Sequence, residues 1–390
     1  MVSGRVLRVA LVVAAGMASW LSGSASSPVR AQGTPTHASA YVVAGHELIA
    51  FDAASGAIIK RLPAVPAGNV SPDLVASPSG QQLLVLGVQL DGNPAGAVSR
   101  LSLVDTTSWR VLATTSVPQR MRYPIAGSSS MVLTRDGSRL FVYNYRVGKP
   151  GTFPYWLSVL DAHTLRHVRG HISLPGCGGA ELVAVPRQIA VLCYADGGIS
   201  ESLRFVDVRR LQVVARIPVR GVGLVASPDG TYVYIGGLSI TQIHAARHRI
   251  VRSDIYPPEE PWTGGVSFWH SVAITDDGKQ LIIGVLADRT DPHSAYALRV
   301  FALPSLRPLR TVPLPQFVHF AAGPGGTLIL FPMPDGPSRD WQVDMLSSGL
   351  DQSRRLFTVA GPVLQLVLAG PAHVTGALPS SWTVHLSPLL

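Results

Sequence analysis

The chain has 390 residues, of which 47% are hydrophobic and 14% charged, and it contains 38 glycines and 31 prolines. A disordered chain is excluded, because the apolar fraction is too high and the charge too low. The composition also argues against a mostly helical protein, because this much glycine and proline would interrupt helices repeatedly. The net charge of +9 comes mainly from scattered arginines. We therefore expect no nucleic-acid partner, although a basic surface favours anionic partners such as cell-wall polymers or lipid headgroups.

The first 31 residues have the pattern of a bacterial export signal. Arg5 and Arg8 precede an apolar run over residues 9–21, and Val29-Arg30-Ala31 provides small residues where a signal peptidase needs them. An uncleaved membrane anchor is the alternative, but the run is shorter than the ~20 apolar residues of a membrane span. We therefore expect a signal peptide at 1–31 and a secreted or extracytoplasmic protein of the bacterial cell envelope. No membrane span is expected once the signal is removed.

The chain has two cysteines, Cys177 and Cys193. An exported protein folds under oxidising conditions, which permit a disulfide. Residues 181–185 and 189–193 are expected to form a hairpin that brings Cys193 close to residue 180. We therefore predict a Cys177–Cys193 disulfide, with two buried thiols as the alternative. Covalently attached haem and structural zinc are not expected, because there is no CxxC or CxxCH motif.

A repeat of about 48 residues runs through the chain after residue 40. In the clearest unit, residues 221–257, two expected strands flank the turn Pro228-Asp229-Gly230, and two more strands follow. Branched or aromatic residues alternate with small polar ones in these segments, which indicates β-structure. Similar turns, two of them degenerate, recur around residues 79, 136, 187, 277, 325 and 371.

A second signature closes the third strand of a unit with an aspartate. It occurs at Asp52, Asp105, Asp161 and Asp207. Aspartate suits such a corner, because its carboxylate can accept hydrogen bonds from backbone N–H groups two or three residues later. The outer strand that follows often ends in proline, which an edge strand tolerates.

Four strands per unit at this spacing predict an all-β fold, a seven-bladed β-propeller of four-stranded blades over residues 40–390. The turns and corners resemble those of YVTN-type repeat propellers, a group similar to the β-chain of quinoprotein amine dehydrogenases and to WD40 propellers. No unit keeps a literal YVTN. Residues 41–43 and 47–51 form the start of a unit that lacks its inner strand, and residues 363–368 can supply it. Pairing of the N- and C-terminal strands would close the ring and remove open edges. A hairpin left over at 373–386 could cap the ring or build an eighth blade.

Alignment of the units on their turns identifies one inner-strand position that is polar or glycine in every unit. This ring position is Asp73, Ser130, Glu181, Gly223, Ser271, His319 and Gln365. We expect it at the mouth of the central channel, whereas the next residue is apolar in every unit and should pack between blades. Asp73, Glu181 and His319 are candidates to hold a metal ion, and the polar ring residues are candidates for a polar ligand. A wet channel mouth would also be polar without binding anything.

A loop rich in aromatic and acidic residues carries further ligand-binding candidates, namely Trp262, Trp269 and His270. Exposed aromatic rings suit a sugar, a peptide or a flat cofactor as ligand. Alternatively, these aromatic side chains pack between blades and bind nothing. Long loops of this kind should lie on the face opposite to the short turns, where function concentrates on rigid scaffolds.

The sequence thus predicts a monomeric binding or scaffolding module that engages a protein, glycan or small molecule at its long-loop face. A quinoprotein- or lactonase-like enzyme with a metal or cofactor at the channel mouth is one alternative, and a membrane-tethered sensor is another. The sequence contains no HExxH, GxSxG or P-loop motif, and it leaves open both catalysis and the identity of any cofactor.

Overall fold

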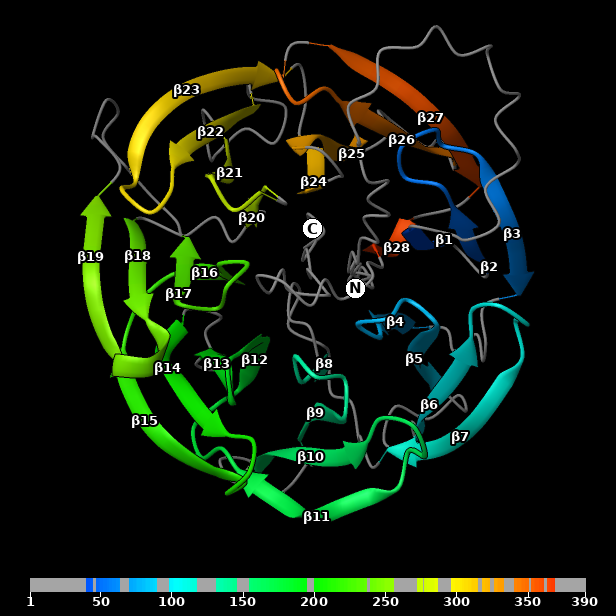
Figure 1. The fold of residues 1–390 in the computed structure, drawn as a ribbon, viewed down its shortest axis with the longest axis vertical. Coiled ribbons are helices and arrows are strands. Elements are labelled where there is room, and N and C mark those ends of the chain that lie inside the picture. Colours follow the sequence, from blue (N-terminus) through cyan, green and yellow to red (C-terminus); the bar gives the residue numbers. More distant parts are fainter. Residues whose placement is uncertain are drawn as a thin grey trace, which may run out of the picture.

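The structure is a computed structural model that shows a ring of seven four-stranded antiparallel sheets (Figure 1). It describes residues 40–44, 47–63, 70–89, 98–117, 131–145, 154–194, 200–236, 239–255, 272–275, 277–286, 296–314, 318–322, 326–332, 340–350, 352–360 and 363–368. The all-β, seven-bladed propeller predicted from the repeat is confirmed. The signal peptide and the hairpin at 373–386 lie outside the described residues. Within these residues, no helix has the length and apolarity needed to span a membrane.

Each blade has an inner strand at the channel, a second and a third strand, and an outer strand at the rim (Figure 1). The inner strands are β28 (Val363–Leu368), β4 (Val70–Ala76), β8 (Met131–Leu133), β12 (Gly179–Val185), β16 (Val222–Ala226), β20 (Val272–Ile274) and β24 (Val318–Ala322), in the order of blades 1 to 7. The second strands are β1 (Ala40–Ala44), β5 (Gln82–Gln89), β9 (Arg139–Tyr145), β13 (Gln188–Tyr194), β17 (Tyr232–Gly236), β21 (Gln280–Leu286) and β25 (Leu328–Pro332).

The outer half of each blade follows the same order. The third strands are β2 (Glu47–Phe51), β6 (Val98–Asp105), β10 (Tyr155–Asp161), β14 (Ser200–Asp207), β18 (Ser239–His244), β22 (Tyr296–Ala302) and β26 (Asp340–Leu346). The outer strands are β3 (Ile58–Pro63), β7 (Val111–Val117), β11 (His167–Ser173), β15 (Gln212–Pro218), β19 (Arg249–Ile255), β23 (Arg307–Leu314) and β27 (Ser353–Ala360). A short 3-10 helix, η2 (Ala245–Arg247), replaces the aspartate corner in blade 5.

Blade 1 is built from both ends of the described chain. Its inner strand β28 pairs antiparallel with β1, so that Val42 lies opposite Leu366. On its other side β1 pairs with β2, where Val42 lies opposite Ile49. The predicted closure of the ring by terminal strands is therefore confirmed, and β28 also lies beside β4 of blade 2.

The hydrophobic core is divided among the seams between neighbouring blades. One cluster joins Phe141 and Leu157 of blade 3 to Leu182 and Val191 of blade 4, and all four side chains are buried. The residue after the ring position is buried in each of the six blades where its side chain is described: Leu74, Met131, Leu182, Leu224, Val272 and Phe320. These residues pack between blades as predicted, because both faces of an inner strand are covered by neighbouring sheets.

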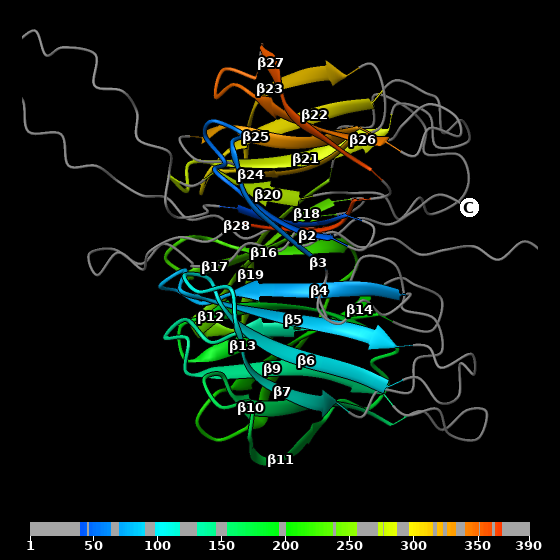
Figure 2. The ribbon, with the colours of Figure 1, turned by 90° about the vertical axis from the view of Figure 1, so that its right-hand side faces the viewer.

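The short turns between first and second strands interlock around one end of the propeller, which Figure 2 shows edge-on. The turn glycine of one blade lies against the turn proline of a preceding blade. A Cβ atom placed on Gly230 would lie 2.4 Å from Cδ of Pro186, and one on Gly137 would lie 2.7 Å from Cδ of Pro78. Gly230 also has a φ of +71°, a left-handed conformation that favours glycine. The glycine is therefore required by both backbone conformation and close approach.

The aspartate corners close the third strands as the sequence predicts. Oδ1 of Asp52 accepts a hydrogen bond from the backbone N–H of Ser55 at 2.7 Å. Oδ1 of Asp105 accepts a hydrogen bond of 2.5 Å from the backbone N–H of Ser108. This hydrogen bond is the main reason that the pKa of Asp105 lies below its usual value. The corners at Asp161 and Asp207 have the same pattern.

Replacement of Gly230 by alanine should destabilise the protein by about 3 kcal/mol, because the methyl group adds a clash with Pro186 to the cost of the left-handed backbone. The matched control is Gly176→Ala. Gly176 has a similar φ of +69°, but a Cβ atom placed on it would meet nothing within 4 Å, so only about 1 kcal/mol should be lost. Chemical denaturation measures both free energies of unfolding. Equal losses in the two variants would contradict the interlock.

Candidate functional site

The candidate site is the ring of inner-strand positions around the channel, and the structure describes only part of it. Asp73 lies on β4, Glu181 on β12 and Gly223 on β16, as the turn alignment predicts. His319 lies opposite Phe331 in the β24–β25 pair, and Gln365 lies opposite Val43 in the β28–β1 pair. Their side-chain positions lie outside the described structure. Also outside it are Ser130, Ser271, Trp262, Trp269 and His270.

Asp73 is buried in the seam between blades 2 and 3, with only 3% of its surface exposed. Its Oδ2 atom accepts a hydrogen bond of 3.0 Å from the backbone N–H of Met131, the first residue of β8. Met131 directly follows the ring position of blade 3. The carboxylate therefore connects the inner strands of two neighbouring blades.

Glu181 has the equivalent place in the seam between blades 4 and 5. Its carboxylate accepts a hydrogen bond from the hydroxyl of Tyr194 on β13. Burial raises the pKa of Glu181 to about 7, an effect that the Tyr194 hydroxyl and the backbone N–H groups of Leu224 and Gly223 partly offset. Since Gly223 and Leu224 belong to β16, the carboxylate again faces the inner strand of the next blade. Burial and the nearby Glu181 carboxylate raise the pKa of Tyr194 well above its usual value.

The two carboxylates thus differ from the expected arrangement at an open channel mouth. Both are nearly fully buried, and they lie in two different seams, with blade 3 between their strands. No cluster of three or more His, Cys, Asp or Glu side chains suited to a metal ion occurs among the residues whose placement is described. A ligand-binding role for Asp73, Glu181 and His319 remains a prediction. The hydrogen bond from Met131 gives Asp73 a role in joining blades 2 and 3, whereas the hydrogen bond to Glu181 comes from Tyr194 of its own blade.

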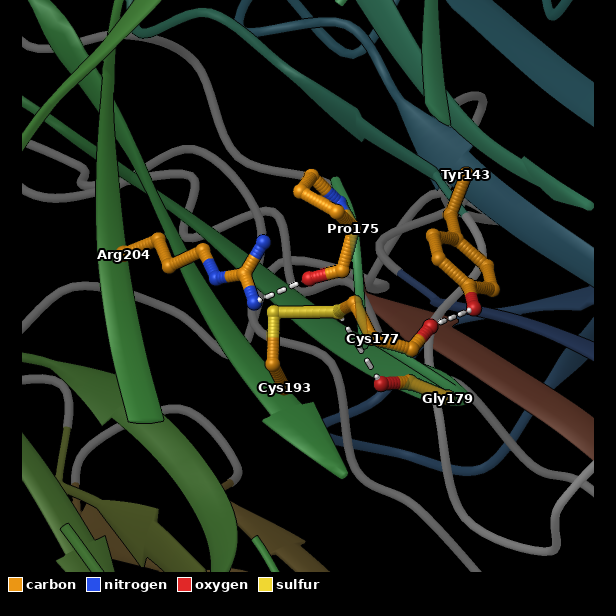
Figure 3. Close-up of a disulfide and its surroundings, with 6 residues drawn as sticks. All are labelled: Tyr143, Pro175, Cys177, Gly179, Cys193 and Arg204. Atoms are coloured by element: carbon orange, nitrogen blue, oxygen red, sulfur yellow. Dashed lines mark hydrogen bonds between the residues drawn. A yellow bond between two sulfur atoms is a disulfide. The ribbon is translucent and has the colours of Figure 1, made fainter. Parts of the chain in front are cut away.

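Cys177 and Cys193 form a disulfide that lies beside the inner strand of blade 4 (Figure 3). Cys193 pairs with Ala180 in the β12–β13 hairpin, which is the geometry that the hairpin predicts. The carbonyl of Cys177 accepts a hydrogen bond from the hydroxyl of Tyr143 in blade 3. Nη2 of Arg204 donates to the carbonyl of Pro175 at 2.7 Å. The disulfide and these two hydrogen bonds therefore fix the segment that enters blade 4. The roles of Tyr143 and Arg204 could not be read from the sequence.

Arg135 connects the short turns of two blades that are not direct neighbours. It belongs to the turn of blade 3, yet its Nη2 atom donates a 2.6 Å hydrogen bond to the carbonyl of Pro228 in the turn of blade 5. Blade 4 lies between blades 3 and 5. Its own turn, between β12 and β13, has only two residues, Pro186 and Arg187, whereas the turn of blade 5 has five residues. Burial lowers the pKa of Arg135, and the charge of Asp229 opposes this shift. At the short-turn end, the turns of different blades thus contact one another.

The stability of the protein should fall as the pH rises from about 4.5 to about 7, because folded Glu181 retains its proton to a higher pH than unfolded Glu181. The stabilising contribution is complete below pH 4.5 and is lost as the pH passes the folded pKa. Its size is on the order of 3 kcal/mol. Glu181→Gln should remove this part of the pH dependence, since an amide cannot ionise.

Urea denaturation at several pH values measures this effect. Glu201→Gln, which changes an exposed glutamate of the same blade, is the control and should follow the wild-type curve. Parallel curves for wild type and Glu181→Gln would show that Glu181 does not titrate in this range.

Comparison with known proteins shows the fold of the chain. No protein-family model and no curated protein matches its sequence. Among solved structures, dihydro-heme d1 dehydrogenase NirN in complex with DHE is similar at 16% identity, over 88% of this chain and 78% of that one, with a TM-score of 0.51. A functionally unknown protein from Desulfotomaculum acetoxidans is similar at 12% identity, over 90% and 99% of the two chains, with a TM-score of 0.51.

A structure of the mitotic checkpoint complex is also similar, at 12% identity over 95% of this chain and 98% of that one, with a TM-score of 0.51. At such low identity the likeness shows the fold alone. The fold is a WD40-like β-propeller.

Proposed function

We propose that the chain is an exported binding module that engages its ligand around the channel, on the face opposite to the short turns. One observation carries the proposal, namely the difference between the two ends of the propeller. At the short-turn end, the Pro–Gly contacts, the Arg135 bridge and the aspartate corners engage the turn residues in contacts between and within blades. The opposite end carries the connections between second and third strands and between blades, where rigid scaffolds present binding residues.

The export part of the proposal is supported by the pattern of residues 1–31 and by the disulfide. A buried disulfide is compatible with an oxidising compartment and uncommon in a reducing one. The membrane-tethered sensor remains an alternative to a cleaved signal.

We take an oligosaccharide as the ligand class. Residues 256–271, which join β19 to β20, contain Trp262 and Trp269 together with Glu259 and Glu260. Indole rings stack on the apolar faces of sugars, and carboxylates accept hydrogen bonds from sugar hydroxyl groups. The catalytic alternative has no comparable support, since Asp73 and Glu181 each face a separate seam.

An array of oligosaccharides that includes bacterial cell-wall fragments tests the proposal, followed by titration calorimetry with the strongest binder. The double variant Trp262→Ala with Trp269→Ala should lose at least tenfold in affinity, which corresponds to about 1.4 kcal/mol. Trp156→Phe changes a half-buried tryptophan on the third strand β10 and is the control, with an affinity within about twofold of wild type. Absence of any bound oligosaccharide at about 1 mM, or equal losses in both variants, would contradict the proposal.

A further inference from the structure

The outer strands of the seven blades carry an uneven distribution of charge. Ten of their residues are lysine or arginine, and Asp254 is their only acidic residue. Some of these cations have a structural role. Nη1 of Arg310 donates to the carbonyl of Gly349 at 2.7 Å, and Nη2 of Arg354 donates to the carbonyl of Ala54 at 2.5 Å. Each of these bonds joins an outer strand to the corner of the next blade, so these arginines are explained by the fold.

Five other arginines on the rim have no such role. They lie on three consecutive blades, among aliphatic side chains that are 37% to 48% exposed. We define this set as the basic–aliphatic arc: Arg166 and Val168 of blade 3, Arg209, Arg210 and Val213 of blade 4, and Arg247, Arg249, Ile250 and Val251 of blade 5. Within the described part of the chain, the five guanidinium groups form no hydrogen bond or ion pair.

The arc covers three neighbouring blades. All its members lie at the start of the outer strands β11, β15 and β19 or in the corners just before them, and these three strands follow one another along the rim in Figure 1. Two acidic residues accompany the arc, Asp161 and Asp207. Their carboxylates accept backbone N–H hydrogen bonds from their own corners, from Thr164 at 2.8 Å and Arg210 at 2.7 Å. The arc therefore combines unpaired positive charge with exposed apolar surface.

Protection of sheet edges explains only part of this composition. Charged side chains on an outer strand prevent edge-to-edge association with another sheet. Exposed valine and isoleucine have the opposite effect, because they add apolar surface to the same edge. Exposed aliphatic side chains also occur on the outer strands of blades 1, 2 and 6, at Ile58, Val111, Leu112 and Leu309, and the arc differs from these in its five unpaired arginines on three consecutive blades.

We propose that the basic–aliphatic arc is a peripheral binding surface for an anionic lipid bilayer. Arginine beside an anionic headgroup layer gains electrostatic energy, and aliphatic side chains between the arginines can enter the boundary between headgroups and acyl chains. A dissolved polyanion would use the arginines but would offer nothing to the aliphatic side chains. This surface is independent of the proposed ligand site, which lies at the other end of the blades.

Co-sedimentation with vesicles tests the proposal on the purified full-length protein. Vesicles of phosphatidylglycerol and phosphatidylcholine are compared with vesicles of phosphatidylcholine alone, at about 0.1 M salt. Wild type should prefer the anionic vesicles. Arg209→Glu with Arg210→Glu should lower this binding at least tenfold, and Val213→Ser with Ile250→Ser at least threefold, each on the order expected for surface anchoring.

The matched control is Lys60→Glu with Arg110→Glu, which changes net charge by the same amount at exposed positions of blades 1 and 2. The vesicle affinity of this control should lie within about twofold of wild type. Every variant keeps residues 1–39, so any contribution of the N-terminal segment to vesicle binding is the same in all of them. The proposal is overturned if the control loses as much as the arc variant, if wild type binds neutral and anionic vesicles alike, or if the aliphatic variant binds like wild type. Melting temperatures verify folding, and Arg247→Glu with Arg249→Glu replaces the first variant if that variant does not fold.

Discussion

Closure of the ring by the pairing of β1 with β28 is the constraint on which the other contacts depend. A blade of this protein is a sheet with apolar residues on both faces, so it is stable only between two neighbours. Each hydrophobic cluster accordingly combines residues of two adjacent blades. If blade 1 lacked its inner strand, the seams on both sides of it would lose part of their cover, and the open edge of β1 would be available for association with other chains.

Buried polar groups give the seams a fixed geometry in addition to apolar area. A carboxylate that is removed from water destabilises the fold unless hydrogen bonds compensate it. For Glu181 the compensation comes from the hydroxyl of Tyr194 in the same blade, whereas for Asp73 it comes from a backbone N–H group of the next inner strand, on Met131. Such a contact is possible at only one rotation between the two sheets. Asp73 therefore favours a particular orientation of blade against blade, in the same way as the Arg135 bridge at the short-turn end.

The features that sequence reasoning could predict are those decided by residues close together in the chain. The turn at Pro228-Asp229-Gly230, the corner at Asp105 and the hairpin that precedes Cys193 each depend on a few consecutive residues with strong local preferences. The closure by residues 363–368 followed from a count of strands, because the first unit lacks one. These elements and their order are present in the structure.

The directions of the side chains at the ring position could not be predicted in the same way. Alternation along a strand places Asp73 on the opposite side from Leu74, and a polar side chain opposite an apolar one suggests a wet surface. Near the axis, however, a sheet covers both sides of each inner strand, so both residues are buried. The contact from Arg135 to Pro228 depends on three blades and on the short turn of the middle one. That two-residue turn at Pro186 and Arg187 was the available signal, and its consequence appears only when the blades are arranged in space.

Native-state hydrogen exchange measured by mass spectrometry tests the closure most directly. If the paired terminal strands complete a single cooperative ring, amides of β1 and β28 should exchange only through global unfolding, with the same opening free energy as amides of β13 in blade 4. Exchange of β1 and β28 at a much lower opening free energy, while β13 stays protected, would show that the ring holds together without its terminal pair.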